Sequence, residues 1–258
     1  MNGFCPLASG SKGNSIFVGT KNTRMLIDAG ISAKMTQERL SLIGVDLKDI
    51  DAILITHEHI DHIRGLQVLA TRYKIPIFAN SDTAKAIYET LGECPRFKIF
   101  STGEPFEFGD IEIHPFSIQH DTLDPVAFTL FLNNLKIGVC TDLGFATSLV
   151  KNHLQLCDYL YLEANHEPSM VHASNRPMTY KQRVLSRQGH LSNEDCAELI
   201  LGSLHPKLKH VYLAHLSQEC NSQELALKIV KEKIAPSNLS VEVSIAFQNT
   251  LSVPICFS

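Results

Sequence analysis

Short apolar runs alternate with amphipathic stretches along the chain. Runs of strand length bounded by turn residues predict strands, and longer stretches with apolar residues at helical spacing predict helices. We expect strands at 15–19, 24–28, 52–55, 77–79, 111–118, 127–132, 136–140, 158–162, 211–214 and 241–245. We expect helices at 32–42, 63–73, 82–91, 192–203 and 222–234, two of them capped near Ser32 and Ser222. This mixture predicts sheets covered by helices.

The length and composition indicate one folded domain. No linker rich in Pro, Ser or Gly divides the 258 residues, so we expect a single domain over residues 1–258. Apolar residues make up 44% of the chain, which is enough for a sizeable core. The net charge of -4 argues against a protein that coats nucleic acid by bulk charge, although it leaves room for a local basic groove.

The seven cysteines and the N-terminal sequence predict a reducing compartment. The cysteine count is odd and no C-x-x-C pair occurs, so we expect buried free thiols, such as Cys140 and Cys157, rather than a disulfide framework or a zinc-thiolate site. The N-terminal segment lacks a basic region followed by an apolar one, and no apolar run is long enough to cross a membrane. We therefore expect a soluble, cytoplasmic protein without a membrane partner.

Several apolar runs end in histidine or acidic residues. They are 52–55 before His57, 136–140 before Asp142, 159–162 before His166 and 211–214 before His215. In α/β architectures, ligands collect beyond the carboxyl ends of strands, because rigid strands deliver loop residues to one place there. We expect the functional site at these strand ends.

The segment Thr56-His57-Glu58-His59-Ile60-Asp61-His62 holds three of the 12 histidines of the chain. Imidazoles and carboxylates suit Zn²⁺, Mn²⁺, Fe²⁺ or Ni²⁺. His57 and His59 can converge on one ion, and a tight turn could direct Asp61 and His62 at a second. The alternative is a polar surface loop, but an apolar strand feeds this segment and a helix follows it.

This segment resembles the H-x-H-x-D-H signature of the metallo-β-lactamase superfamily. Counterparts of its other motifs occur in the right order, with Asp28 in MLIDAG before it and His120 in SIQHD, Asp142 in GVCTDLG and His215 in VYLAHLS after it. The resemblance implies a mixed α/β fold, the four-layer αββα metallo-β-lactamase sandwich, with the site along one edge between the sheets.

The resemblance also implies two divalent metal ions, whether Zn, Mn, Fe or Ni, and a hydroxide between them as the nucleophile. In the superfamily pattern, one ion is held by His57, His59 and His120, the other by Asp61, His62 and His215, and Asp142 bridges both, with Asp28 behind the ligands. Taken alone, His120 is an ordinary surface histidine, Asp142 a turn residue and His215 a strand-end histidine.

Two further residue sets are candidates for the chemistry. His190, flanked by Gly189, could protonate a leaving alkoxide or clamp a phosphate oxygen, and Asp61 is the other candidate catalytic residue. Asn165 and His166 lie in a segment similar to the E-x-N-H-D sequence of the bacterial YycJ-type subgroup, and we expect them to support the ligands. Glu167 replaces the usual Asp there, so its role is left open. The alternative for His190, Asn165 and His166 is a hydrogen-bonded loop without chemistry.

The same subgroup implies a phosphodiesterase, namely a nuclease that acts on DNA. It resembles this chain in the loop at 9–15 and in the region of Lys181 and Arg183. The loop could present backbone N–H groups to an anion, and a basic stretch near a metal site could track a phosphate backbone. The candidate substrate-binding residues are Lys12, Asn14, Ser15, Lys181 and Arg183. The alternatives are an ordinary turn and a solvated helix face.

Other functions stay open at this point. Asp at position 142 resembles the phosphodiesterase, nuclease and glyoxalase branches of the superfamily, whereas many lactamases carry another residue there. A small-molecule phosphodiesterase, a thioester hydrolase of glyoxalase II type and a catalytically silent nucleic-acid-binding module share the fold. The sequence does not separate DNA from RNA, endonuclease from exonuclease action, or a monomer from a homodimer.

Overall fold

The computed structural model describes residues 1–92 and 97–257. Contacts between Cα atoms divide these residues into two compact units, each of which is described by itself. Unit 1 comprises residues 1–113, 122–126 and the segment from 247 onward, and unit 2 comprises residues 114–121 and 127–246.

The first sheet, which lies in unit 1, has the strand order β14-β1-β2-β3-β4-β5-β6. The strands are β1 (Gly3–Ala8), β2 (Ser15–Gly19), β3 (Arg24–Ile27), β4 (Ala52–Leu54), β5 (Ile77–Ala79), β6 (Phe97–Ile99) and β14 (Ile255–Cys256). From β3 to β6 the neighbours are parallel, and β1 and β2 are antiparallel to their neighbours. Since β3 and β4 are parallel, their carboxyl ends lie at one edge, where Asp28 and His57 follow them.

Helices connect the parallel strands of unit 1. They are α1 (Ala33–Leu42), η1 (Leu47–Asp49), α2 (Ile60–Ile63), α3 (Leu66–Arg72) and α4 (Ser81–Leu91). The Oγ atom of Ser32 accepts a hydrogen bond from the Met35 backbone and caps α1, as expected from the sequence. All residues of β1, β2 and β4 are buried, which explains their nearly continuous apolar sequences.

The second sheet has the strand order β13-β12-β11-β10-β9-β8-β7. Its strands are β7 (Phe106–Phe108), β8 (Ile111–Ser117), β9 (Val126–Leu132), β10 (Leu135–Cys140), β11 (Tyr159–Glu163), β12 (His210–Ala214) and β13 (Glu242–Ile245). The strands from β10 to β13 run parallel, with Cys140 opposite Leu162 and Glu163 opposite Ala214. Their carboxyl ends therefore lie at one edge, which brings together the residues that follow β10, β11 and β12.

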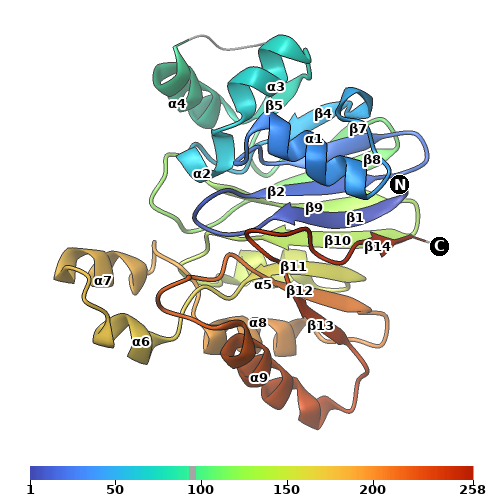
Figure 1. Cartoon of the computed structure of the whole chain (residues 1–258). Coiled ribbons are helices and arrows are strands. Elements are labelled where there is room, and N and C mark those ends of the chain that lie inside the picture. Colours follow the sequence, from blue (N-terminus) through green and yellow to red (C-terminus); the bar gives the residue numbers. More distant parts are fainter. Residues whose placement is uncertain (93–96, 258) are drawn as a thin grey trace. The chain divides into compact units, whose positions relative to one another are not determined.

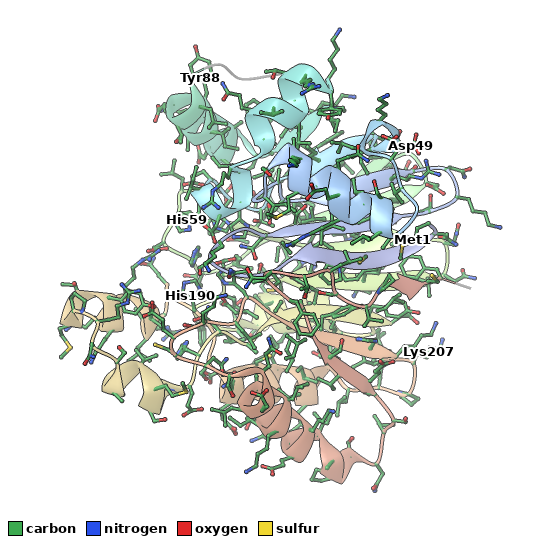
Figure 2. All side chains as sticks on the ribbon, viewed as in Figure 1. Met1, Asp49, His59, Tyr88, His190 and Lys207 are labelled. Atoms are coloured by element: carbon green, nitrogen blue, oxygen red, sulfur yellow. The ribbon has the colours of Figure 1, made fainter. Side chains whose placement is uncertain are left out.

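The helices of unit 2 are α5 (Ser148–Leu154), α6 (Pro168–Ala173), α7 (Met178–Val184), α8 (Asn193–Ser203), α9 (Gln223–Ile234) and η2 (Ala235–Ser237). Helices α8 and α9 pack against each other, and α9 also packs against β13 (Figure 1). The hydroxyls of Ser192 and Ser222 cap α8 and α9, so the predicted cap at Ser222 is confirmed. The loop between α7 and α8 carries His190 (Figure 2).

All the strands and helices expected from the sequence are found, but the sequence reading missed several elements. It missed β1, which contains Pro6 and a register shift between Pro6 and Ala8, because proline in a run argues against a strand. It missed β6, β7 and β14, which are too short to show a period. It also missed α2, α5, α6 and α7, and it placed the start of α3 at residue 63, although α3 begins only after Gly65.

The thiols in the described residues agree with the expectation. Cys5, Cys140, Cys157, Cys196 and Cys220 are free and buried, and Cys256 is free and exposed. Burial raises the pKa of Cys5 to about 12, which keeps this thiol protonated. Cys94 lies outside the described residues. Within the part of the chain that the structure describes, no helix has the length and apolar character required to span a bilayer.

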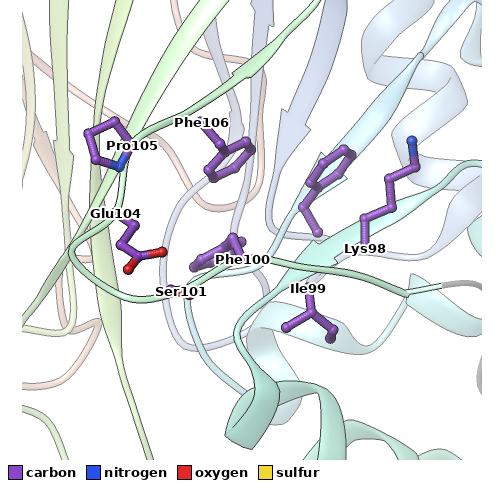
Figure 3. Close-up of a pocket in the computed structure, with 8 residues that line it drawn as sticks. Lys98, Ile99, Phe100, Ser101, Glu104, Pro105 and Phe106 are labelled. Carbon is purple, nitrogen blue, oxygen red and sulfur yellow. The ribbon is translucent and has the colours of Figure 1, made fainter.

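An aromatic pocket of about 380 Å³ lies in unit 1 (Figure 3). Phe106 stacks on Phe78 and on Phe100, with ring centroids 5.6 Å and 5.4 Å apart, and Lys98 and Glu104 contribute polar groups to the lining. None of the histidines or aspartates expected as metal ligands lines this pocket. It is therefore separate from the candidate metal site.

Candidate metal centre

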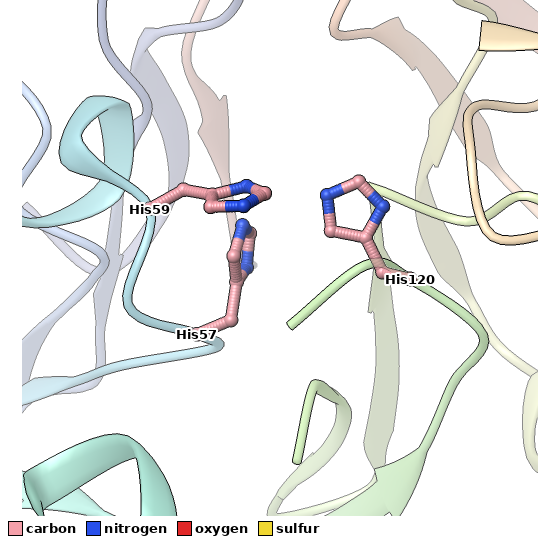
Figure 4. Close-up of side chains that lie close together, drawn as sticks. All are labelled: His57, His59 and His120. Carbon is pink, nitrogen blue, oxygen red and sulfur yellow. The ribbon is translucent and has the colours of Figure 1, made fainter. Parts of the chain in front are cut away.

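The loop after β4 gathers three histidines in unit 1. Figure 4 shows His57 and His59 on this loop, with ring centroids 4.8 Å apart. The centroids of His57 and His62 are 4.0 Å apart, and both side chains are completely buried. Asp61 and His62 follow in the short helix α2. The segment 57–62 thus brings three imidazoles and the Asp61 carboxylate close together in the sequence.

Asp28 fixes the orientation of His62. Its Oδ2 atom lies 2.7 Å from His62 Nδ1, and its Oδ1 atom accepts a hydrogen bond of 2.9 Å from the Thr56 backbone N–H. A carboxylate oxygen accepts, so Nδ1 carries the proton and Nε2 is the ring nitrogen that can act as an acceptor or ligand. Asp28 has a φ of 61°, a left-handed conformation that is strained for a residue other than glycine. Asp28 thus contacts His62, which is itself a candidate ligand.

Asn14, in the loop between β1 and β2, contacts residues of α2. Its Nδ2 atom lies 3.2 Å from Asp61 Oδ2 and 3.0 Å from His62 Nε2, and its backbone N–H donates to the Asp61 carbonyl. Gly30 packs against this carbonyl so closely that a Cβ atom would overlap the Asp61 oxygen. Asn14 therefore contacts candidate metal ligands.

Three residues that follow β8, β10 and β12 are the candidate ligands of unit 2. Asp142 and His215 are buried, and both adopt left-handed backbone conformations with φ of 58° and 53°. This backbone conformation is strained at residues other than glycine, and such strain is typical of functional sites. His120, the third side chain drawn in Figure 4, lies with its Nδ1 atom 3.0 Å from the Gly189 carbonyl, so this nitrogen donates and Nε2 is left for a ligand.

Glu163, at the end of β11, accepts hydrogen bonds from two histidines and two backbone N–H groups of unit 2. Its Oε1 atom lies 2.9 Å from His190 Nδ1 and 2.8 Å from His215 Nδ1, and its Oε2 atom accepts hydrogen bonds from the Leu143 and Leu191 backbones. Burial acts to raise the pKa of Glu163, but the charge of His190 and the hydrogen bonds from both imidazoles outweigh it and lower the pKa to about 2. The carboxylate is thus ionised, and both histidines donate to it through Nδ1.

Asn165 and His166 follow β11, where Asn165 contacts the end of β12 and His166 contacts the start of α8. The Asn165 side chain donates a hydrogen bond of 2.7 Å to the His215 carbonyl, which helps to hold the strained backbone there. His166 is buried and accepts a backbone hydrogen bond from Asn193. Burial lowers the pKa of His166 and favours its neutral form. A supporting role of both residues at the metal site stays a prediction.

The donor sets fit divalent metals. In unit 2, Asp142, Glu163, His190 and His215 each offer a ligand atom, and these atoms lie within 4.8 Å of one another. Unit 1 offers the residues of the segment 57–62. Buried nitrogen and carboxylate donors suit Zn²⁺, Mn²⁺, Fe²⁺ or Ni²⁺, so the donor chemistry does not choose among these ions.

The family model of the metallo-beta-lactamase superfamily matches residues 8–174, which is more than half of the chain. The chain belongs to the metallo-β-lactamase superfamily. Membership agrees with the two sheets and the mixed α/β structure, and it confirms the fold and the resemblance inferred from the motifs.

Two curated exodeoxyribonucleases are similar to this chain over nearly their whole length. Exodeoxyribonuclease YycJ of Bacillus anthracis is 36% identical over 249 residues, which cover 96% of this chain and 94% of that protein. Exodeoxyribonuclease WalJ of Streptococcus pneumoniae serotype 2 is 37% identical over 248 residues, which cover 95% and 92% of the two chains. The predicted similarity to the YycJ-type subgroup is thus confirmed.

Solved structures of the superfamily share the fold. The metallo-beta-lactamase fold protein YhfI from Bacillus subtilis matches with a TM-score of 0.72 and 17% identity, and the match covers 96% of this chain and 97% of that chain. A diphosphatase of the PhnP family matches with a TM-score of 0.68 and 18% identity over 98% of both chains.

The candidate substrate-binding residues of unit 1 have different surroundings. Lys12 is exposed, and its carbonyl accepts a hydrogen bond of 2.6 Å from Arg64. Ser15 is completely buried in β2. The structure therefore leaves Lys12 available to a substrate, whereas direct contact between the Ser15 hydroxyl and a substrate is not supported.

The basic residues before His190 contact partners within unit 2. Arg183 pairs with Asp121, and the Lys181 ammonium donates to the His172 carbonyl. The sequence showed no acid within the basic stretch, but the fold supplies Asp121 from 62 positions away. Lys181 and Arg183 remain exposed or half-exposed, so a role in substrate binding stays a prediction.

The sequence reading underestimated two residues of this superfamily site. Glu163 stood in a candidate segment, but its contact with both His190 and His215 was not foreseen. The only sequence signal was an acidic residue at the end of a strand whose other positions are apolar. Thr56, whose hydroxyl lies 2.9 Å from Asp28 Oδ2, gave no signal beyond its place in the motif.

Proposed function

We propose that this protein is a metal-dependent phosphodiesterase that degrades DNA. The observation that carries this proposal is the similarity over nearly the whole chain to the two exodeoxyribonucleases. The metal-donor sets of both units and the fold support it, because superfamily hydrolases act through such sites. This is the enzyme class expected from the sequence.

We propose the superfamily ligand pattern for this chain. The seven ligands of two divalent ions would be His57, His59, Asp61, His62, His120, Asp142 and His215. The Nδ1 protons of His62, His120 and His215 are each directed at an oxygen within their own unit, so Nε2 is the nitrogen that would coordinate an ion. Two divalent ions in such a site activate a water molecule and stabilise the negative charge that develops on a phosphoryl group.

His190 is the proposed proton donor. Its Nδ1 atom is held by Glu163, so Nε2 faces the opposite side of the ring and can give a proton to the leaving oxygen. The ionised Glu163 accepts the Nδ1 hydrogen bond and holds the ring in one orientation. Asp61, which Asn14 holds by a hydrogen bond, would orient the attacking water as well as hold an ion.

The test is a nuclease assay on metal-stripped full-length protein to which Mn²⁺, Zn²⁺ or Mg²⁺ is returned, with single- and double-stranded DNA as substrates. We expect metal-dependent cleavage that is abolished in His59→Ala and Asp61→Ala. His172→Ala, which changes an exposed histidine of α6, is the matched control and should cleave at the wild-type rate. Cleavage that persists in both ligand variants would contradict the assignment.

Salt dependence separates DNA from a small phosphodiester as the natural substrate. Contacts to several phosphates release counterions, so DNA affinity should fall steeply as salt rises. Hydrolysis of bis-p-nitrophenyl phosphate, which has one phosphate, should change little. A protein that cleaves the small ester but binds DNA with no salt dependence would be a small-molecule phosphodiesterase instead.

A further inference from the structure

Arg187 differs from the other basic residues that precede His190. Arg176 pairs with Glu219, Arg183 pairs with Asp121, and Lys181 donates to a carbonyl. The guanidinium of Arg187 instead lies over the ring of Phe145, 4.1 Å from its centroid, and has no hydrogen-bond or ion-pair partner among the described residues. Its charge is therefore not neutralised by a carboxylate.

Phe145 is a partly exposed aromatic residue. It is 39% exposed, although the Arg187 guanidinium lies over its ring. An aromatic ring with an accessible surface and a stacked cation is a surface on which a flat ring system can stack. The pair Phe145 and Arg187 is called the stacking pair below.

The fold holds the stacking pair close to the candidate chemistry of unit 2. Phe145 follows Asp142 by three residues and Arg187 precedes His190 by three, so each lies within about 11 Å of that residue along the chain. Gly144 packs against the Arg187–Gly189 backbone so tightly that a Cβ atom would lie 2.5 Å from the Arg187 carbonyl. The two segments are therefore fixed against each other, and the stacking pair is preorganised.

A small cavity adjoins Phe145 but not Arg187. Its volume is about 140 Å³, and its lining includes Phe145, Leu191, Lys151, Asp195 and Glu198. The apolar side chains can contact the faces of a ring, the two carboxylates can accept hydrogen bonds from exocyclic amino groups, and the Lys151 ammonium can donate to a ring carbonyl. Asp195 also accepts a hydrogen bond from the Ser192 hydroxyl and Glu198 pairs with Lys233, so the lining is polar and its charges are largely balanced, which suits a neutral heterocycle.

We propose that Phe145 and Arg187 bind a nucleobase of the DNA substrate next to the scissile phosphodiester. The base stacks on Phe145 and extends toward the cavity, and Arg187 contacts the base or the adjoining phosphate. This inference rests on the proposed nuclease function and names the part of the substrate that this surface recognises. It assigns a role to Phe145, which lies outside every motif found in the sequence.

The experiment compares oligonucleotides in which a single nucleotide near the cleaved bond is replaced, position by position, by an abasic residue. The wild-type kcat/KM should fall about tenfold for the abasic residue at one position, because stacking on an aromatic side chain contributes about this much. Phe145→Ala should lose about tenfold on intact DNA and nothing more on that abasic substrate. Phe145→Trp should cleave intact DNA at least as well as the wild type.

Tyr88→Ala is the matched control, because Tyr88 is an exposed aromatic residue of α4 that the proposal does not involve. Metal content and circular dichroism of each variant establish that the site and fold are intact. Additive losses from Phe145→Ala and the abasic residue, or full activity of Phe145→Ala on intact DNA, would overturn the proposal. Absence of DNA cleavage by the wild type would instead refute the nuclease function, and the base-binding role with it.

Discussion

The Oε1 atom of Glu163 lies 2.9 Å from Nδ1 of His190, and both side chains belong to unit 2. Replacement of the carboxylate in Glu163→Gln exchanges a charged acceptor for an amide, which weakens the hydrogen bonds that hold the His190 and His215 rings. We expect turnover to fall by about 10–100-fold. Because Glu163 also holds His215, the affinity for metal should fall in the same variant, which metal analysis after dialysis would measure. Unchanged turnover would show that Glu163 is only structural.

His190→Ala separates proton transfer from metal binding. If His190 donates the proton, turnover on DNA should fall by about 10²–10⁴-fold while the metal content stays at the wild-type level. A substrate with a good leaving group, such as bis-p-nitrophenyl phosphate, should be affected less, because its leaving oxygen needs no proton. Loss of metal in this variant would assign His190 a structural role.

Asp28→Asn tests the orientation of His62. Asparagine tolerates the left-handed backbone at this position, so the substitution removes the carboxylate without adding strain. We expect metal affinity to fall by about 10–100-fold, as measured by competition with a chelator. Asp82→Asn, in the exposed first turn of α4, is the control and should bind metal normally.

Arg183→Ala tests whether the basic stretch follows a DNA backbone. The pair with Asp121 is exposed, so its loss should change the free energy of unfolding by no more than about 1 kcal/mol. Binding of long DNA should weaken, with a salt slope that is smaller by about 0.7–0.9 for one lost phosphate contact. Equal losses on long DNA and on a small phosphodiester would reject the idea.

The lowered pKa of His153, which lies outside the candidate metal site, predicts that the stability of the fold depends on pH. Burial, followed by the charges of Lys136 and His114, lowers the pKa of His153, whose ring stacks on Phe116. The unfolded chain takes up this proton near pH 6.5, whereas the folded protein resists it, so stability falls as the pH drops below about 6.5 and levels off below the folded pKa. His153→Gln should reduce the difference between urea midpoints at about pH 7.5 and about pH 5.5. An unchanged difference would contradict this.

The candidate ligands could be predicted from sequence because they cluster. Three histidines and an aspartate fall within the segment 57–62, and the remaining ligands follow apolar strands in a fixed order. Glu163 and His190, by contrast, are 27 positions apart, and they meet because the loop between α7 and α8, which carries His190, packs against the end of β11. No local pattern encodes such a contact.

The stacking pair could not be predicted from the sequence either. Phe145 and Arg187 lie on segments joined through the packing of Gly144, and neither residue has a spacing that marks it. The basic stretch was visible as a set of positive charges, but which of them are neutralised depends on Asp121 and Glu219, which are distant in sequence. Pairing of charges across a fold is a tertiary property.

The parallel register of β10, β11 and β12 makes the site of unit 2 sensitive to chain length. Side chains alternate between the two faces of a strand, so the loss of a single residue within β11 would move Glu163 to the other face while the strands still paired. Insertions in the connections between these strands would leave the register unchanged. We therefore expect length variation in this protein to be tolerated between the strands and to abolish catalysis within them, in molecules that still fold.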